Sequence, residues 1–80
     1  MSTNFRKISY NRIMNNFSSN LRQLRTNKNI SQKQLAEILN TTNSSICDWE
    51  TGRSEPNIEN IIKLARFFEI STDALLGLED

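Results

Sequence analysis

The sequence predicts an all-α fold made of five short helices. Apolar residues recur at spacings of three and four, which places them on one face of a helix, and no strand-like alternation persists. Between these segments stand Ser, Thr, Asn and Gly, the residue types that begin and end helices. The 80 residues make one domain, and its core has to be compact because a chain of this size buries only about 60% of its unfolded surface.

The first helix is expected over residues 17–26, because Phe17, Leu21 and Leu24 share one helix face. Asn29 follows it and tolerates the left-handed conformation that often closes a helix. Residues 1–16 mix apolar residues with cations and asparagines and show no clean period. We therefore expect an N-terminal extension over 1–16, either disordered or forming an extra segment, a domain over 17–77 and a tail over 78–80.

The second helix is expected to begin after Ser31, which forms a capping-box pattern with Gln34. Asn40 stands where a left-handed residue would end this helix. The apolar side of the helix is expected to consist of Leu35, Ala36, Ile38 and Leu39.

The third helix follows after only about three residues, with Thr41 or Thr42 as its N-terminal cap and Gly52 at its end. Ile46 and Trp49 are expected to point inward. Two helices joined this closely have the length and chemistry of a helix-turn-helix, in which the two helices cross at a large angle.

Pro56 marks a loop, since the residue before a proline is pushed out of helical geometry. A fourth helix is expected over residues 57–70 and a fifth before Gly77, with Asn57 and Ser71 as their caps. The side chains expected to dock these two helices are Ile58, Ile61, Ile62, Ala65, Phe68, Leu75 and Leu76.

The charges are divided unevenly along the chain. Residues 1–33 carry seven basic side chains and no acidic one, whereas residues 34–80 carry three basic and nine acidic ones, a balance of −6. Such asymmetry indicates a polyanionic partner, although short chains also divide their charges by chance.

Several kinds of chemistry are disfavoured by the composition. The single cysteine, Cys47, cannot form an internal disulfide, and without any histidine a metal site is nearly excluded. A reducing cytoplasm is the expected location, no cofactor is expected, and no apolar run approaches the ~20 residues of a membrane span.

The outer face of the third helix raises a functional question. Opposite Ile46 and Trp49, its side chains are short and able to form hydrogen bonds: Asn43, Ser44, Cys47 and Asp48. Docking the helix onto a core does not require such a face. It is either a solvated surface or a surface that contacts a partner.

Residues 17–77, about three quarters of the chain, resemble the Cro/cI-type (XRE-like) helix-turn-helix domain of bacterial and phage transcription regulators. The resemblance is carried by LRQLRTNKNISQKQLAEILNTTNSSICDWETGRSEP and by LARFFEISTDALLG. Several independent spacings agree, among them Ser-Gln-x-x-Leu-Ala opening the second helix and Ile-x-x-Trp-Glu-x-Gly ending the third. The resemblance implies a five-helix, lambda-repressor-like domain.

The resemblance also implies that the third helix, about residues 42–51, lies in the major groove of double-stranded DNA. Short side chains that donate and accept hydrogen bonds suit base edges, which explains the polar face. The residues implied in base readout are Asn43, Ser44, Asp48 and Thr42. Those implied in phosphate contacts are Gln32, Arg53, Asn40, Ser54 and Arg25.

Two residues have further implied roles. In this family an arginine of the first helix commonly pairs with the glutamate that ends the third, which implies a structural ion pair between Arg25 and Glu50. Asp48 departs from the family pattern, which commonly has an amide or a cation there. It either accepts a hydrogen bond from cytosine N4 or pairs with a neighbour such as Arg53.

The function implied is that of a cytoplasmic, sequence-specific transcriptional regulator of the bacterial or phage repressor type, binding a partly palindromic operator as a homodimer. Whether it represses or activates is left open by these residues. The dimer contact is expected at Leu75, Leu76 and Leu78, the alternative being that these leucines belong to the core and that Leu78 frays. The alternative is a protein-interaction module, such as an antitoxin or anti-repressor, that uses residues 1–16 to bind its partner. Catalysis is disfavoured because the sequence has no histidine and no phosphate-binding glycine loop.

Overall fold

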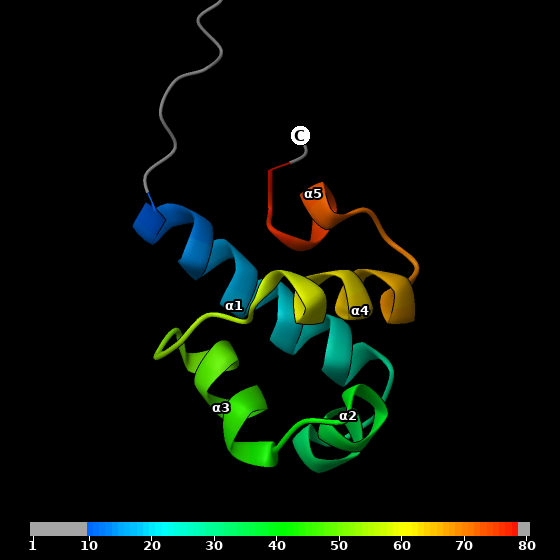
Figure 1. Ribbon diagram of the computed structural model, residues 1–80. Coiled ribbons are helices and arrows are strands. Elements are labelled where there is room, and N and C mark those ends of the chain that lie inside the picture. Colours follow the sequence, from blue (N-terminus) through cyan, green and yellow to red (C-terminus); the bar gives the residue numbers. More distant parts are fainter. Residues whose placement is uncertain (1–9, 79–80) are drawn as a thin grey trace, which may run out of the picture.

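The computed structural model describes residues 10–78, which form five helices and no strand (Figure 1). The expected five-helix, all-α fold is confirmed. The helices are α1 (Tyr10–Asn27), α2 (Gln32–Leu39), α3 (Asn43–Thr51), α4 (Ile58–Phe68) and α5 (Thr72–Leu75).

α1 begins at Tyr10 and is longer than the helix expected over residues 17–26. Ile13 is half-buried and lies four residues before Phe17, so it continues the apolar stripe of Phe17 and Leu21. The second turn of this helix lies against the other end of the chain, since a Cβ added at Gly77 would lie 2.7 Å from Asn16 Cβ. Residues 1–9 of the expected extension lie outside the described part of the chain.

The helix ends follow the expected chemistry. Ser31 accepts a hydrogen bond from the Gln34 backbone while the Gln34 side chain accepts one from Ser31 N, so the capping box is formed. Left-handed residues close α2 and α3, as expected, at Asn40 (φ 59°) and Gly52 (φ 79°). Thr42, Asn57 and Ser71 each cap the helix that follows them.

One helix end was not expected. Glu69 closes α4 in the left-handed conformation with φ 59°, and its backbone N–H bonds back to the last turn. Glutamate adopts this conformation less readily than glycine or asparagine, so residue type did not indicate the stop.

The core contains most of the apolar residues that the periodicity selects. The buried ones are Phe17, Leu21, Leu35, Ala36, Leu39, Ile46, Trp49, Leu64, Ala65, Phe68 and Leu75. The expectation was wrong for Ile38, Ile58 and Ile62, which are 49%, 75% and 40% exposed. α4 carries more apolar residues than one face can hold. Its buried face runs through Leu64, which is not among the residues expected from the periodicity.

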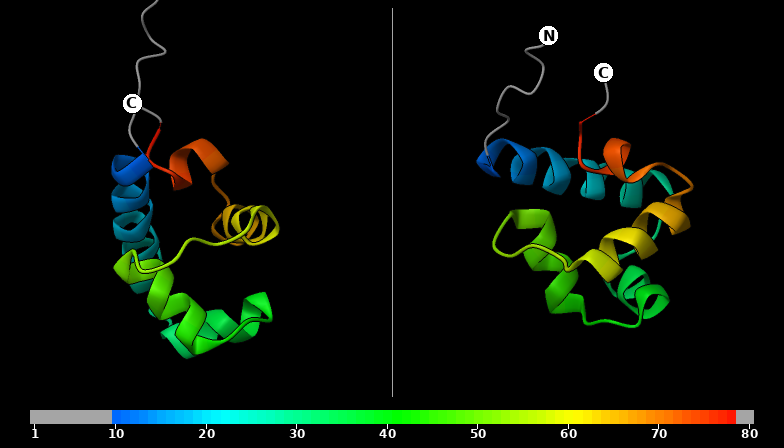
Figure 2. Two further views of the ribbon diagram at one scale, coloured as in Figure 1. Left: turned by 60° about the vertical axis from the view of Figure 1, so that its left-hand side comes forward. Right: turned by 45° about the horizontal axis from the view of Figure 1, so that its top comes forward.

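α2 and α3 lie together at one end of the molecule and α5 lies at the other, with α1 and α4 between them (Figures 1 and 2). α1 contacts both α3 and α5, and α2 contacts α3 and α4. The helix-turn-helix is therefore supported from behind by α1 and α4, while the outer side of α3 stays open. Of the helices in the described range, none is long and apolar enough to cross a membrane.

Candidate nucleic-acid interface

The outer face of α3 begins with exposed polar side chains. Asn43 and Ser44 are both exposed in the first turn of the helix, and Asp48 is half-buried one turn further on. Thr42 has a different position, because its hydroxyl accepts from Ser45 N (3.1 Å) and donates to Ser45 Oγ (3.0 Å). Its hydrogen-bonding groups are therefore occupied by the helix cap, and its methyl group is the part left for a partner.

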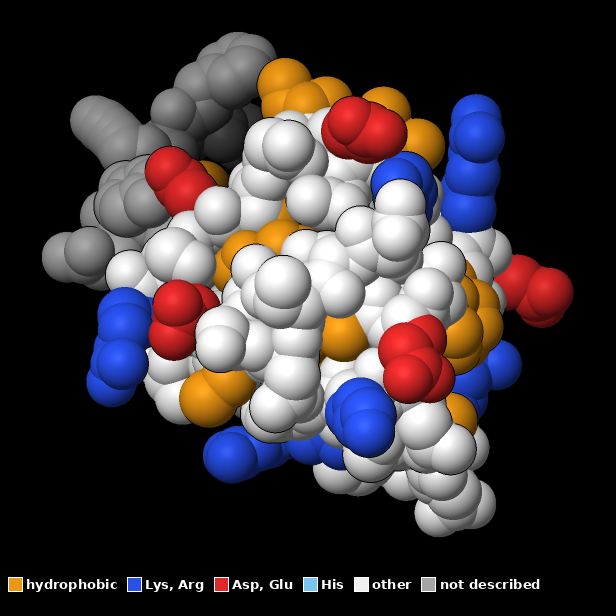
Figure 3. All heavy atoms as spheres, turned by 60° about the horizontal axis from the view of Figure 1, so that its bottom comes forward, with side chains coloured by type: hydrophobic (Ala, Val, Ile, Leu, Met, Phe, Trp, Pro, Cys, Tyr) orange, Lys and Arg blue, Asp and Glu red, His pale blue; other side chains and the backbone are white. Residues whose placement is uncertain are grey.

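Figure 3 views the molecule from the end that carries α2 and α3. Uncharged side chains and backbone (white) occupy most of the middle of this face, with some apolar surface among them, and most lysines and arginines lie toward its edge, with acidic side chains interspersed. The uncharged middle of this face suits contacts to base edges, and the cations toward its edge suit contacts to phosphates.

The inner side of α3 is fixed by a buried carboxylate. The side chain of Glu50 is completely buried, and Arg25 donates to it twice, from Nε to Oε2 (2.6 Å) and from Nη2 to Oε1 (3.0 Å). The third guanidinium nitrogen, Nη1, donates to the carbonyl of Ile30 (2.9 Å). Arg25 thus joins α1 to α3 and to the turn before α2, through the two-pronged geometry that favours arginine over lysine.

These hydrogen bonds to Glu50 raise the pKa of Arg25 above its ordinary value, against an opposing effect of burial. A basic group whose pKa is higher in the folded chain than in the unfolded chain stabilises the folded state. This stabilisation is fully present at pH values below the pKa of the unfolded chain, and it is lost as the pH rises through the pKa of the folded chain. The guanidinium therefore stays charged at every pH near neutrality, and its side of the ion pair does not titrate there.

Gln32 takes part in the same network. Its amide nitrogen donates to Glu50 Oε1 (3.1 Å), so the first residue of α2 is tied to the end of α3. The sequence had suggested a phosphate contact for this side chain. The structure assigns the amide nitrogen a contact inside the protein, at the junction of the two helices.

The loop after α3 folds back over the end of that helix. The backbone N–H of Arg53 donates to the carbonyl of Asp48 (2.9 Å), and Arg53 Nη1 lies 3.9 Å from Asp48 Oδ1. This ion pair is loose, with the arginine side chain 77% exposed. Of the two interpretations of Asp48, the contact favours pairing with Arg53. Asn40, which precedes α3 in the sequence, and Ser54, which follows it, are both exposed.

Two residues of this region were missed by sequence reasoning. Ser18 is 7% exposed, and its hydroxyl donates to the carbonyl of Trp49 (2.6 Å), which adds a second polar link between α1 and α3. Arg22, 64% exposed, places its Nε 3.9 Å from Glu50 Oε1. The signal was available, since Ser18, Arg22 and Arg25 follow one another at spacings of four and three along one side of α1.

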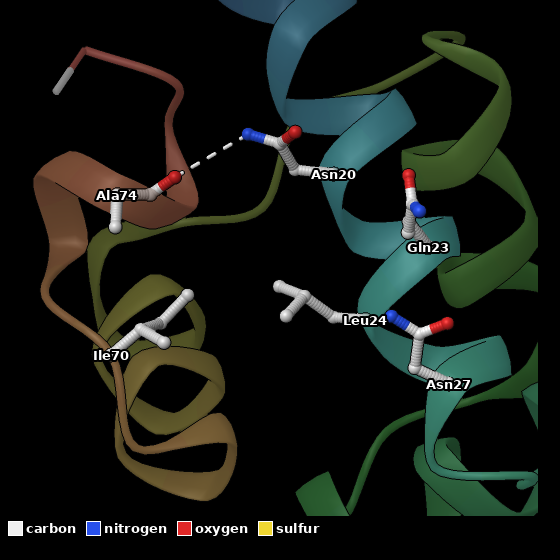
Figure 4. A pocket seen from close by; sticks show the side chains of 6 residues that line it. All are labelled: Asn20, Gln23, Leu24, Asn27, Ile70 and Ala74. Carbon is white, nitrogen blue, oxygen red and sulfur yellow. Dashed lines mark hydrogen bonds between the residues drawn. The ribbon is translucent and has the colours of Figure 1, made fainter. Parts of the chain in front are cut away.

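A shallow hollow of about 350 Å³ lies between α1 and the segment that leads into α5 (Figure 4). Leu24 and Ile70 face each other across it, and the amide of Asn20 donates to the carbonyls of Ala74 (3.3 Å) and Leu75 (3.2 Å). None of the residues expected to contact DNA lines this hollow. Asn20 therefore fastens α5 to α1 on a different side of α1 from the Glu50 network.

Comparison with known proteins agrees with this architecture. The model of the helix-turn-helix family matches residues 21–75. The HTH-type transcriptional activator BcrR of Enterococcus faecalis is 42% identical over 64 residues, which cover 80% of this chain and 31% of BcrR. The chain spans less than two thirds of the length of BcrR and of two other curated relatives, both from Bacillus subtilis.

Two solved structures have the same fold. The P22 c2 repressor in complex with a synthetic operator is 30% identical and superposes with a TM-score of 0.74, over 79% of this chain and 96% of c2. The restriction-modification controller protein C.AhdI of Aeromonas hydrophila is 34% identical, with a TM-score of 0.70, over 78% of this chain and 90% of C.AhdI. The chain therefore belongs to the helix-turn-helix family, and its resemblance to regulators of the Cro/cI type is confirmed.

Proposed function

We propose that this protein regulates transcription by binding double-stranded DNA sequence-specifically, with α3 in the major groove. The observation that carries the proposal is the outer face of α3, where Asn43 and Ser44 are exposed on a helix whose inner side is fixed by the buried Glu50. A helix held rigidly from behind can present short hydrogen-bonding side chains to base edges at a defined depth.

The remaining contacts divide by exposure. Arg53, Ser54 and Asn40 are exposed around α3 and suit phosphate oxygens, which supply affinity without reading sequence. Arg25 is only 13% exposed in its side chain, and all three of its guanidinium nitrogens have protein acceptors. We therefore assign Arg25 a structural role. The amide nitrogen of Gln32 already donates to Glu50, so a phosphate contact by Gln32 has to use its second N–H or replace that bond.

Binding as a homodimer to a partly palindromic operator is part of this proposal. Regulators with the same fold include one named an activator and one named a repressor, so the similarity does not favour either direction of control. The alternative function, a protein-interaction module, depends on the N-terminal residues, of which 1–9 lie outside the described range. Deleting residues 1–9 leaves α1 whole, and DNA binding should survive the deletion.

Selection of bound sequences from random duplex DNA, at near-physiological salt, tests the proposal. A two-fold symmetric consensus is the expected result. If no sequence is enriched and binding is weak and salt-sensitive, the chain does not read DNA sequence and the interaction module takes its place.

A further inference from the structure

The hollow between α1 and the segment that leads into α5 contains none of the residues assigned to DNA contacts (Figure 4). Three carboxamides and three apolar side chains line this α1–α5 hollow: Asn20, Gln23, Asn27, Leu24, Ile70 and Ala74. None of these lining residues is charged, although 24% of the residues in the chain are. A surface without charges that combines apolar and hydrogen-bonding groups is typical of the centre of a protein interface.

Contacts within the protein fix the shape of the hollow. Asn20 Nδ2 donates to the carbonyls of Ala74 (3.3 Å) and Leu75 (3.2 Å), which fastens α5 to α1. The side chain of Leu75 is fully buried, so it anchors α5 in the core and is not available for the dimer contact expected from the sequence. A ligand therefore meets a preformed surface and does not have to order it.

Two of the three amides are unused within the described part of the chain. Gln23 and Asn27 are exposed, and no described residue forms a hydrogen bond with either side-chain amide. Such an amide carries donors and an acceptor side by side, so it can pair with a peptide group.

The three amides are arranged in a line. Asn20, Gln23 and Asn27 follow one another at spacings of three and four, so they form a stripe along one side of α1. The stripe is about 10 Å long, because a helix rises about 1.5 Å per residue. Three residues of extended chain, at about 3.3 Å each, have the same length.

The apolar part of the hollow suits one aliphatic side chain. Leu24 and Ile70 face each other across it, and both are only partly buried (Figure 4). A small molecule needs a pocket that encloses most of its surface, whereas an extended peptide can lie in a shallow hollow and continue past both ends. A phosphate is disfavoured because no cation lines the hollow.

We propose that the α1–α5 hollow binds an extended, uncharged peptide segment of a partner protein. One aliphatic side chain of the segment packs between Leu24 and Ile70. The peptide groups beside that side chain pair with the amides of Gln23 and Asn27. The hollow lies on a different side of α1 from Arg25, which holds α3, so the partner can bind while α3 contacts DNA.

Selection of random peptides displayed on phage against the full chain, followed by NMR titration with each synthetic peptide, tests the proposal. Enriched peptides are expected to share an aliphatic residue between uncharged neighbours. They should shift the amide signals of Leu24, Ile70 and Ala74. A selection that enriches no peptide, or peptides that shift mainly the signals of the exposed Ile58 and Ile62, would overturn the proposal.

A double variant tests the amide stripe. Gln23→Ala/Asn27→Ala removes two exposed amides and leaves the core intact, and it should raise the dissociation constant of the peptide on the order of tenfold, because two hydrogen bonds are lost. The matched control is Asn43→Ala, at an exposed amide of α3, which should bind the peptide as the natural chain does. If the double variant melts normally and keeps its peptide affinity, the peptide does not lie along the stripe and the proposal is wrong.

Deleting residues 1–9 distinguishes a partner protein from the N-terminus of the chain itself. The deletion should leave the signals of Leu24 and Ile70, and the affinity for the peptide, unchanged. If the deletion shifts these signals and tightens peptide binding, the chain's own segment fills the hollow and the proposed partner is excluded.

The inference goes beyond the proposed function, and a DNA arm separates the two. Gln23→Ala/Asn27→Ala should bind a selected duplex as the natural chain does, and the peptide should stay bound when duplex is added. Displacement of the peptide by the duplex would place it on the DNA-binding face and overturn this proposal. A natural chain that binds the peptide but no duplex would instead remove the proposed function alone.

Discussion

α3 and α4 are attached to the same core by different forces. α3 buries only Ile46 and Trp49 as apolar side chains, and polar contacts from Arg25, Gln32 and Ser18 hold the rest of its inner side. α4 buries Leu64, Ala65 and Phe68 and is held mainly by packing.

The difference follows from what each helix leaves exposed. α3 keeps a polar outer face, so its short sequence has little room for apolar residues, and directional hydrogen bonds fix its position instead. α4 has more apolar residues than the core covers, and Ile58 and Ile62 stay exposed on its outward side. Changes to the polar contacts of α3 should therefore affect stability most, whereas changes to its outer face should affect only recognition.

The largest effect is expected for Glu50→Ala, which leaves Nε and Nη2 of the largely buried Arg25 guanidinium without their carboxylate acceptor. Breaking one side of a buried ion pair costs about 3–5 kcal/mol, which is a large fraction of the stability of a small domain. Urea or thermal unfolding followed by circular dichroism measures it. Arg25→Ala should also lower the melting temperature, whereas Arg22→Ala, at an exposed and distant pair, should change stability by less than about 1 kcal/mol. Unchanged melting of Arg25→Ala would rule out the structural role.

Ser18→Ala should have the next largest effect. It removes a buried hydroxyl that donates to the carbonyl of Trp49 and leaves that carbonyl without this donor, at a cost of about 1–2 kcal/mol. Denaturant unfolding of this variant beside Ser19→Ala, an exposed neighbour on α1, isolates the contribution of the link to α3. Equal midpoints for the two variants would show that the link is dispensable.

Gly52→Ala should cost about 1–2 kcal/mol through its backbone alone, because residue 52 closes α3 with φ 79°. Space is not the obstacle, since an added Cβ would have Ser18 Oγ as its nearest neighbour, at 3.7 Å. Gly52→Asn should recover part of the loss, because asparagine tolerates this conformation. If Gly52→Asn has the same melting temperature as Gly52→Ala, the left-handed conformation is not the cause of the lost stability.

The smallest effect on stability is expected on the outer face of α3. Asp48→Ala removes a loose pair with Arg53 and should change stability by less than about 1 kcal/mol. If Asp48 only pairs with Arg53, the preferred DNA sequence stays the same and binding tightens, because a carboxylate near phosphates is removed. Relaxed preference at one base pair would instead indicate a contact to cytosine, worth about 1–3 kcal/mol of discrimination.

The sequence was most informative where one residue decides one local structure. Ser31, Asn40, Thr42 and Gly52 indicated the ends of α2 and α3 because caps depend on only a few neighbouring residues. The start of α1 could not be predicted this way, since its N-terminal part lies against the C-terminal end of the chain at Gly77. The stop at Glu69 could not be predicted either, because glutamate rarely adopts the left-handed conformation found there.

The site shows the same division. The polar outer face of α3 is visible in its residues, and the pairing of Arg25 with Glu50 came from family resemblance. The parts played by Gln32, Ser18 and Arg22 depend on how three helices meet, which no local pattern specifies. Similarly, helical periodicity selected Ile58 as apolar but could not tell which of two apolar faces of α4 the core would cover.

The most direct test of the account is to repeat the selection from random duplex DNA with Asn43→Ala and with Arg53→Ala, after confirming that both variants melt as the natural chain does. We predict that Asn43→Ala changes the preferred bases within each half-site. Arg53→Ala should keep the same consensus and weaken binding to all sequences alike, with a less steep dependence on salt. An unchanged consensus for Asn43→Ala, or an altered one for Arg53→Ala, would contradict the assignment of base readout to the outer face of α3.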